Sequence, residues 1–98
     1  MRKIEEIKKI LYEQRDEIKK RFGVKEIGIF GSYTREEQTN ESDIDILVEF
    51  SEGYKTFDNY MDLKFYLEEL LNVSVDLIMK SALKPALAPK ILQEVIYV

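Results

Sequence analysis

The stretch that decides the fold is residues 29–48, Ile-Phe-Gly-Ser-Tyr-Thr-Arg-Glu-Glu-Gln-Thr-Asn-Glu-Ser-Asp-Ile-Asp-Ile-Leu-Val. An apolar run ends at Gly31-Ser32, a mostly polar segment follows, and a second apolar run opens with Asp43 and Asp45. Because side chains alternate across a strand, these two carboxylates project from one face. Aspartate is depleted in strands, and two like charges about 4 Å apart repel by roughly 4 kcal/mol at an effective dielectric near 20. The pair therefore predicts either a bound cation or a strong compensating field.

Outward from this stretch, apolar residues recur at helical spacing on two segments and at strand spacing on three. Gly23 and Asn72 are expected helix stops. The predicted elements are a helix over residues 3–22, strands over 25–30 and 43–50, a short turn and loop over 33–42, a helix over 57–71, a strand over 73–79, an irregular or short helical stretch between Pro85 and Pro89, and an apolar end over 90–98. This order, α-β-β-α-β with a terminal helix, predicts one α/β (α+β) domain over residues 1–98, with a small mixed sheet of three to four strands and helices packed on one side.

The composition limits which catalytic groups and metal ligands the protein can use. The 98 residues include no cysteine and no histidine, so thiol chemistry, imidazole bases and the usual zinc ligands are excluded. Any metal must be a hard cation bound by oxygen. The net charge of -4 disfavours direct nucleic-acid binding. The charged first residues and the lack of a long apolar run predict neither a signal peptide nor a membrane span, so a cytoplasmic protein is expected.

Asp76 is a third acid, set in the otherwise apolar run Val-Ser-Val-Asp-Leu-Ile-Met at residues 73–79. If this strand pairs beside the one that carries Asp43 and Asp45, three carboxylates meet. Such a site suits magnesium, which takes one or two carboxylates plus substrate phosphates, and two such ions can support phosphoryl or nucleotidyl transfer. Taken singly, Asp43 could instead be a cap or turn residue, and Asp76 the partner of a lysine.

Gly31-Ser32 follows a predicted strand directly. A glycine there lets the backbone approach a phosphate, and the Ser32 hydroxyl can donate to a phosphate oxygen. The same dipeptide also makes an ordinary turn and helix cap, so the pair alone is a weak signal. The loop that leaves this glycine returns to the paired aspartates, which favours the phosphate-binding interpretation.

Gly31-Ser32, ten residues and Asp43-Ile44-Asp45 together resemble the G-S-x10-D-x-D signature of the DNA polymerase β-like nucleotidyltransferase superfamily. The small size and the sequence that flanks the motif are similar to those of the minimal nucleotidyltransferases. The similarity extends to residues 75–78, 82–85 and 91–97. The resemblance implies a palm-like nucleotidyltransferase fold.

The resemblance also implies roles for single residues. Asp43 and Asp45 would coordinate two magnesium ions, and Asp76 would be the third ligand and the base for the acceptor hydroxyl. Gly31 and Ser32 would hold the nucleotide triphosphate. Family members often read Ala-Arg-Gly where this chain has Thr34-Arg35-Glu36, so Arg35 is retained as a phosphate contact while the glycine is lost.

Finally, the resemblance implies a partner. Minimal nucleotidyltransferases resemble antitoxins that add AMP from ATP to a tyrosine of a HEPN-domain toxin, with release of pyrophosphate. The short chain predicts that another polypeptide completes the acceptor site, either the toxin in a hetero-oligomer or a second copy in a homodimer. Two alternatives stay open. One is a non-catalytic antitoxin that binds the toxin, and the other is a transferase for a small molecule such as an aminoglycoside or a sugar phosphate.

Overall fold

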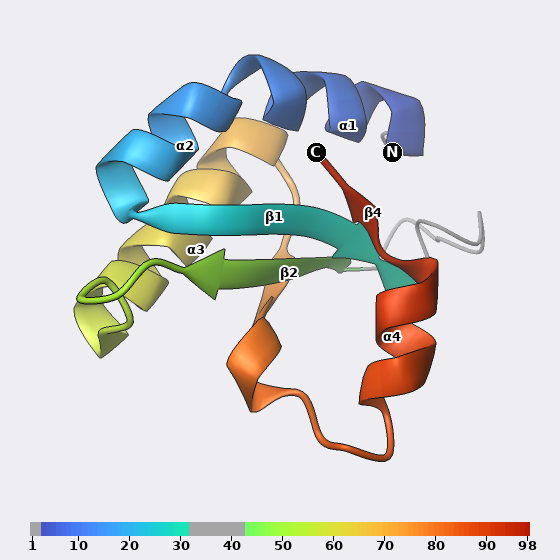
Figure 1. The fold of residues 1–98 in the computed structure, drawn as a ribbon. Coiled ribbons are helices and arrows are strands. Elements are labelled where there is room, and N and C mark those ends of the chain that lie inside the picture. The colour runs from blue at the N-terminus through green and yellow to red at the C-terminus, as the bar shows by residue number, and fades with distance from the viewer. Residues whose placement is uncertain (1–2, 32–42) are drawn as a thin grey trace.

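The computed structural model describes residues 3–31 and 43–98 (Figure 1). Four α-helices, four strands and one 3-10 helix are formed by these residues. In chain order they are α1 (Ile4–Glu13), α2 (Arg15–Phe22), β1 (Val24–Phe30), β2 (Ile44–Phe50), α3 (Phe57–Leu71), β3 (Val75–Met79), the 3-10 helix η2 (Lys80–Ala82), α4 (Ala88–Glu94) and β4 (Ile96–Tyr97).

The prediction of one continuous helix over residues 3–22 was wrong. The chain leaves helical geometry at Gln14, with φ -100° and ψ 5°, and a second helix begins at Arg15. Both helices keep an apolar stripe, since Ile7 of α1 and Ile18 of α2 are fully buried. Apolar spacing alone therefore did not reveal the break. By contrast, α3 has its predicted bounds, and Asn72 ends it in the left-handed conformation with φ 53°.

The strands form one mixed sheet in the order β3-β2-β1-β4. Strand β2 runs parallel to β3, and β1 runs antiparallel to both β2 and β4. This confirms the predicted small mixed sheet. Strand β3 begins at Val75, two residues later than expected, and β4 was not predicted as a strand.

The core lies between α1, α2 and α3 and one face of the sheet. Alternate residues of each strand reach it, such as Ile29 of β1, Ile46 of β2 and Leu77 of β3, and they meet Leu67 of α3. Full burial of a Leu or Ile side chain contributes about 1.5–3 kcal/mol. The residues between them, including Asp45 and Asp76, consequently face the opposite side of the sheet.

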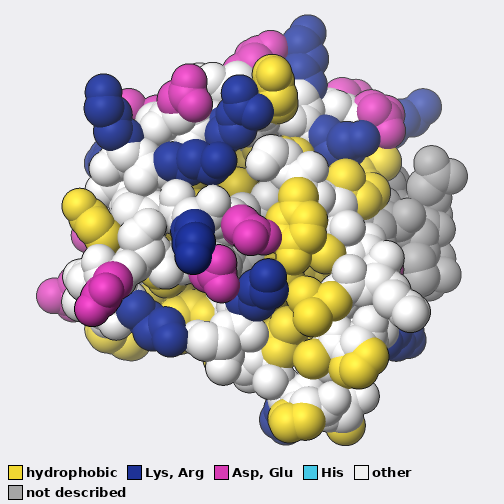
Figure 2. Space-filling model, in the orientation of Figure 1, with side chains coloured by type: hydrophobic (Ala, Val, Ile, Leu, Met, Phe, Trp, Pro, Cys, Tyr) yellow, Lys and Arg dark blue, Asp and Glu magenta, His cyan; other side chains and the backbone are white. Residues whose placement is uncertain are grey.

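The predicted packing of helices on one side holds for α1, α2 and α3 but not for α4. Helix α4 has no buried residue and lies beside the end of β1 where the chain leaves the sheet (Figure 1). On the face of the molecule that Figure 2 shows, hydrophobic side chains gather on the half where α4 lies. Lys, Arg, Asp and Glu dominate the other half. Leu87, the N-cap residue of α4, and Leu92 within that helix are exposed. Among the described residues, no helix has both the length and the apolar character needed to cross a bilayer.

Candidate active site

Asp45 and Asp76 are direct neighbours in the sheet. They are register partners on the parallel strands β2 and β3, between the apolar pairs Ile44–Val75 and Ile46–Leu77. Partners in register have side chains on the same face, and adjacent strands lie about 4.8 Å apart. Asp45 is half-buried and Asp76 is exposed. Two carboxylates from separate segments thus meet on the face that α1, α2 and α3 leave open.

Asp43 lies just before β2 and is exposed. Asp43 therefore lies at the end of the strand, two positions before Asp45. Within residues 3–31 and 43–98, no three acidic side chains are close enough to form a ready cation site. The structure therefore pairs Asp45 with Asp76 and leaves Asp43 at the rim.

This donor set fits magnesium. The acids offer only hard oxygen ligands, and magnesium in enzyme sites is typically held by one or two carboxylates together with phosphate oxygens of the substrate. Two neighbouring carboxylates on one open sheet face meet the protein's part of that requirement. Like charges at this spacing repel, which favours cation binding.

Gly31 packs directly against Asp45. Its φ is 81°, a backbone conformation that L residues with side chains rarely adopt. A Cβ placed on Gly31 would overlap the carboxylate of Asp45. The space that a side chain would fill is therefore taken by a predicted magnesium ligand, and glycine is required here for two independent reasons.

Ser32 and Arg35, the other predicted nucleotide contacts, lie outside the described residues, as does the turn and loop predicted over residues 33–42. Their roles stay predictions.

Glu94 is a residue that the sequence analysis missed. The backbone N–H of Gly31 donates a 2.9 Å hydrogen bond to its Oε1, across 63 positions of sequence. Glu94 is the last residue of α4, and β4 begins two residues later. One acid in an apolar tail gives no local signal of such a contact, because only the return of the chain to β1 brings it there.

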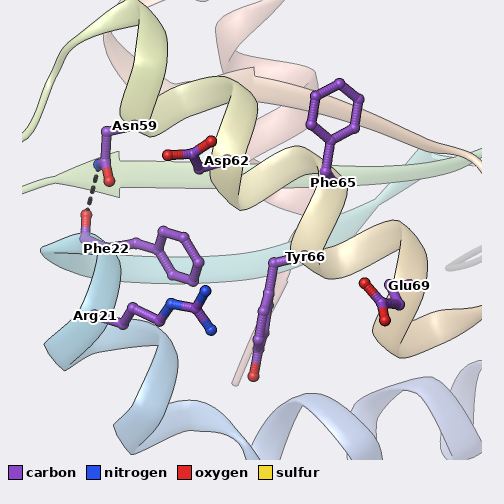
Figure 3. A pocket seen from close by; sticks show the side chains of 7 residues that line it. All are labelled: Arg21, Phe22, Asn59, Asp62, Phe65, Tyr66 and Glu69. Carbon is purple, nitrogen blue, oxygen red and sulfur yellow. Dashed lines mark hydrogen bonds between the residues drawn. The ribbon is translucent and has the colours of Figure 1, made fainter.

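The helical side of the molecule carries a separate pocket of about 460 Å³ (Figure 3). Figure 3 shows its lining side chains on α2 and α3: Arg21, Phe22, Asn59, Asp62, Phe65, Tyr66 and Glu69. The Arg21 guanidinium lies 5.1 Å and 5.4 Å from the ring centroids of Phe22 and Tyr66. Burial, followed by the negative charge of Glu17, raises the pKa of Tyr66 against the opposing effect of Arg21. Helix α3 packs on the core face, so this pocket is not part of the acidic site.

Comparison with known proteins agrees with this geometry. Residues 11–98 match the family model described as a nucleotidyltransferase domain. The chain is 50% identical over 95 residues to the protein adenylyltransferase MntA of Thermococcus cleftensis, covering 97% of this chain and 95% of that protein.

Two solved structures share the fold. One, described as a candidate minimal nucleotidyltransferase, has a TM-score of 0.76 and 34% identity, covering 92% of this chain and 93% of the other. The second is a chain of a toxin–antitoxin crystal structure with AMP-PNP, with a TM-score of 0.70 and 26% identity, covering 93% of this chain and 70% of the other. The chain therefore belongs to the nucleotidyltransferase domain family, of which it is a minimal member.

Proposed function

We propose that this protein is a magnesium-dependent protein adenylyltransferase that transfers AMP from ATP to a tyrosine of a HEPN-domain toxin, and so acts as the antitoxin. The observation that carries the proposal is the register of Asp45 beside Asp76, with Gly31 packed against the Asp45 carboxylate. The name of the Thermococcus relative and the toxin–antitoxin complex with an ATP analogue support the donor and the kind of partner.

In this proposal Asp43, Asp45 and Asp76 hold two magnesium ions. When bound, the ions neutralise charge on the phosphates and stabilise the attacking and leaving oxygens. Gly31 brings the backbone close to the triphosphate, while Ser32 and Arg35 bind its oxygens. A triphosphate would supply oxygen ligands in addition to these carboxylates.

The transfer step is an in-line displacement at the α-phosphorus of ATP. The tyrosine oxygen forms a bond to that phosphorus as the bond to the bridging α–β oxygen breaks, and pyrophosphate leaves. Asp76 accepts the hydroxyl proton, since it is exposed on the open face where an acceptor can reach it. The products are tyrosine-linked AMP, pyrophosphate and a proton.

The acceptor has to approach from the open face, because α1, α2 and α3 cover the other side of the sheet. A protein acceptor would complete the site as a hetero-oligomer with this chain. Adding an anionic nucleotide to the toxin would oppose its binding of RNA through charge and bulk. A reaction that consumes ATP suits the cytoplasm, which is where we place the protein.

The test is incubation of the protein with magnesium, ATP labelled at the α-phosphate, and a purified HEPN-domain toxin as the acceptor. We expect label on a tyrosine of the partner and none when Asp45→Asn replaces the wild type. Asp62→Asn is the matched control, because Asp62 is an exposed acid on the helical side. It should transfer label at the wild-type rate.

Two results would contradict the proposal. Neutralisation of the toxin by Asp45→Asn as complete as by the wild type, with no label on protein, would identify a binding antitoxin. Label on an aminoglycoside or a sugar phosphate in place of the protein would identify a small-molecule transferase.

A further inference from the structure

Glu94 links the C-terminal segment to the candidate active site. Its carboxylate accepts the hydrogen bond from the Gly31 N–H at 2.9 Å. A hydrogen bond to an ionised acceptor is roughly twice as strong as one between neutral groups. The contact is therefore strong enough to fix the backbone at this glycine.

The fold brings Glu94 there through β4. This strand pairs with β1 in the register Gly28–Tyr97 and Ile29–Ile96, and the Val98 N–H donates to the Ile27 carbonyl at 3.0 Å. Gly28 permits this approach, since a Cβ there would lie 2.7 Å from Val95 Cγ2 and 2.9 Å from the Ile96 carbonyl oxygen.

The hydrogen bond from Gly31 to Glu94 takes the next position in the ladder between β1 and β4, with a side chain as the acceptor. In a strand, alternate residues direct their N–H toward the same neighbour. The backbone groups of Ile27 and Ile29 point toward β4, so the N–H of Gly31 points toward the same edge. Beyond the last β1–β4 pair the partner is no longer a backbone carbonyl but the Glu94 carboxylate.

Gly31 is consequently held between two acids. Glu94 binds its N–H, and the Asp45 carboxylate occupies the space beside its α-carbon. A shift of the Gly31 backbone would therefore alter its contact with the Asp45 carboxylate. Asp45 in turn stands in register with Asp76.

We infer that Glu94 is a positioning residue for nucleotide transfer. By holding the Gly31 backbone from the β4 edge, it keeps the Asp45 carboxylate in its orientation beside Asp76 and keeps Gly31 itself in place for a triphosphate. This role rests on the proposed function. It makes the C-terminal segment, residues 88–98, part of the site.

The experiment compares Glu94→Ala and Glu94→Gln with Gln93→Ala, a matched control at the neighbouring exposed position of α4. Glutamine keeps an oxygen acceptor for the Gly31 N–H, whereas alanine removes it. We expect kcat for AMP transfer to fall about 10- to 100-fold in Glu94→Ala, a loss comparable to that of an outer-shell contact at a metal site. Glu94→Gln should lose clearly less kcat than Glu94→Ala, because glutamine keeps an oxygen acceptor but lacks the charge that strengthens the bond.

A second readout does not need transfer. Hydrogen exchange at the Gly31 amide, followed by NMR, should be slow in the wild type, Gln93→Ala and Glu94→Gln, and fast in Glu94→Ala. Calorimetry with Mn²⁺ and AMP-PNP should show weaker binding by Glu94→Ala alone. Thermal unfolding establishes that each variant is folded under the assay conditions.

The inference is overturned if Glu94→Ala keeps the wild-type kcat and Mn²⁺·AMP-PNP affinity, or if Glu94→Gln is as impaired as Glu94→Ala. If the wild type transfers no AMP, the proposed function fails. Unchanged Mn²⁺·AMP-PNP binding by Glu94→Ala would then overturn the positioning role, and weaker binding would support it.

Discussion

The carboxylate of Asp45 occupies the space that a side chain on Gly31 would need. Gly31 directly follows β1, and Asp45 lies in the neighbouring strand β2, where it pairs with Phe30. The pairing of β1 with β2 thus brings Gly31 and Asp45 into direct contact although they are separated in the sequence. Its consequence is that the glycine cannot be replaced without moving a predicted magnesium ligand.

Gly31→Ala should lower transfer by about 100-fold, because displacing a group of the site by roughly 1 Å costs that much. It should also lower the free energy of unfolding by about 1–3 kcal/mol through the strained positive φ. Steady-state kinetics and urea denaturation measure the two effects.

Gly53→Ala is the matched control for that substitution. Gly53 has a similar φ of 88°, yet a Cβ there would meet nothing within 4 Å. It should show the loss of stability but keep the wild-type kcat. Equal losses of kcat in both variants would mean that backbone strain alone, without the contact to Asp45, accounts for the effect.

Asp76→Asn should stabilise the protein in the absence of divalent cations. The substitution removes a like-charge pair across β2 and β3, which typically costs about 0.2–1 kcal/mol. It should also abolish the rise in Tm that magnesium and ATP produce in the wild type. Scanning calorimetry with and without both ligands measures this change. A variant that keeps the full ligand-induced rise would show that Asp76 does not hold the ion.

Asn59→Ala should destabilise the fold and leave transfer intact. The Asn59 side-chain amide donates to the Phe22 carbonyl at 2.7 Å and to the Tyr54 carbonyl at 2.9 Å, joining the end of α2 to the segment before α3. Leaving buried polar groups without partners costs about 1–3 kcal/mol, and the partly buried Phe22 bond should approach the lower part of that range. Urea denaturation checks the stability, and kcat should be unchanged because Asn59 lies on the helical side.

The contribution of Lys80 to the stability of the fold should depend on pH in the alkaline range. Tyr97, followed by Glu26, whose carboxylate lies 3.8 Å from the Lys80 Nζ, raises the pKa of Lys80 above its ordinary value of 10.5. A group whose pKa is raised by folding contributes stability below its unfolded pKa and loses it as the pH rises through the folded value. The difference in Tm between the wild type and Lys80→Gln should therefore be constant at neutral pH and shrink above pH 10.5. A difference that grows above that pH would contradict the assignment.

Local spacing was enough to predict most of the elements. The apolar period of α3, its αL stop at Asn72 and the alternation of β2 are properties of contiguous residues, so they can be read from sequence. The break between α1 and α2 at Gln14 could not be predicted from the sequence, because both helices keep the same apolar stripe. The later start of β3 follows from pairing, which begins with Ile44 and Val75.

The sequence by itself determined which chemistry is possible. A chain without histidine or cysteine, with acids set into apolar strands behind a glycine turn, is restricted to oxygen ligands and phosphate chemistry. Only the tertiary structure decided which of these acids are neighbours. The parallel register puts Asp76 beside Asp45, and β4 returns the chain so that Glu94 binds Gly31. Such contacts join residues 31 and 63 positions apart, and their geometry depends on strand pairing, which no local pattern encodes.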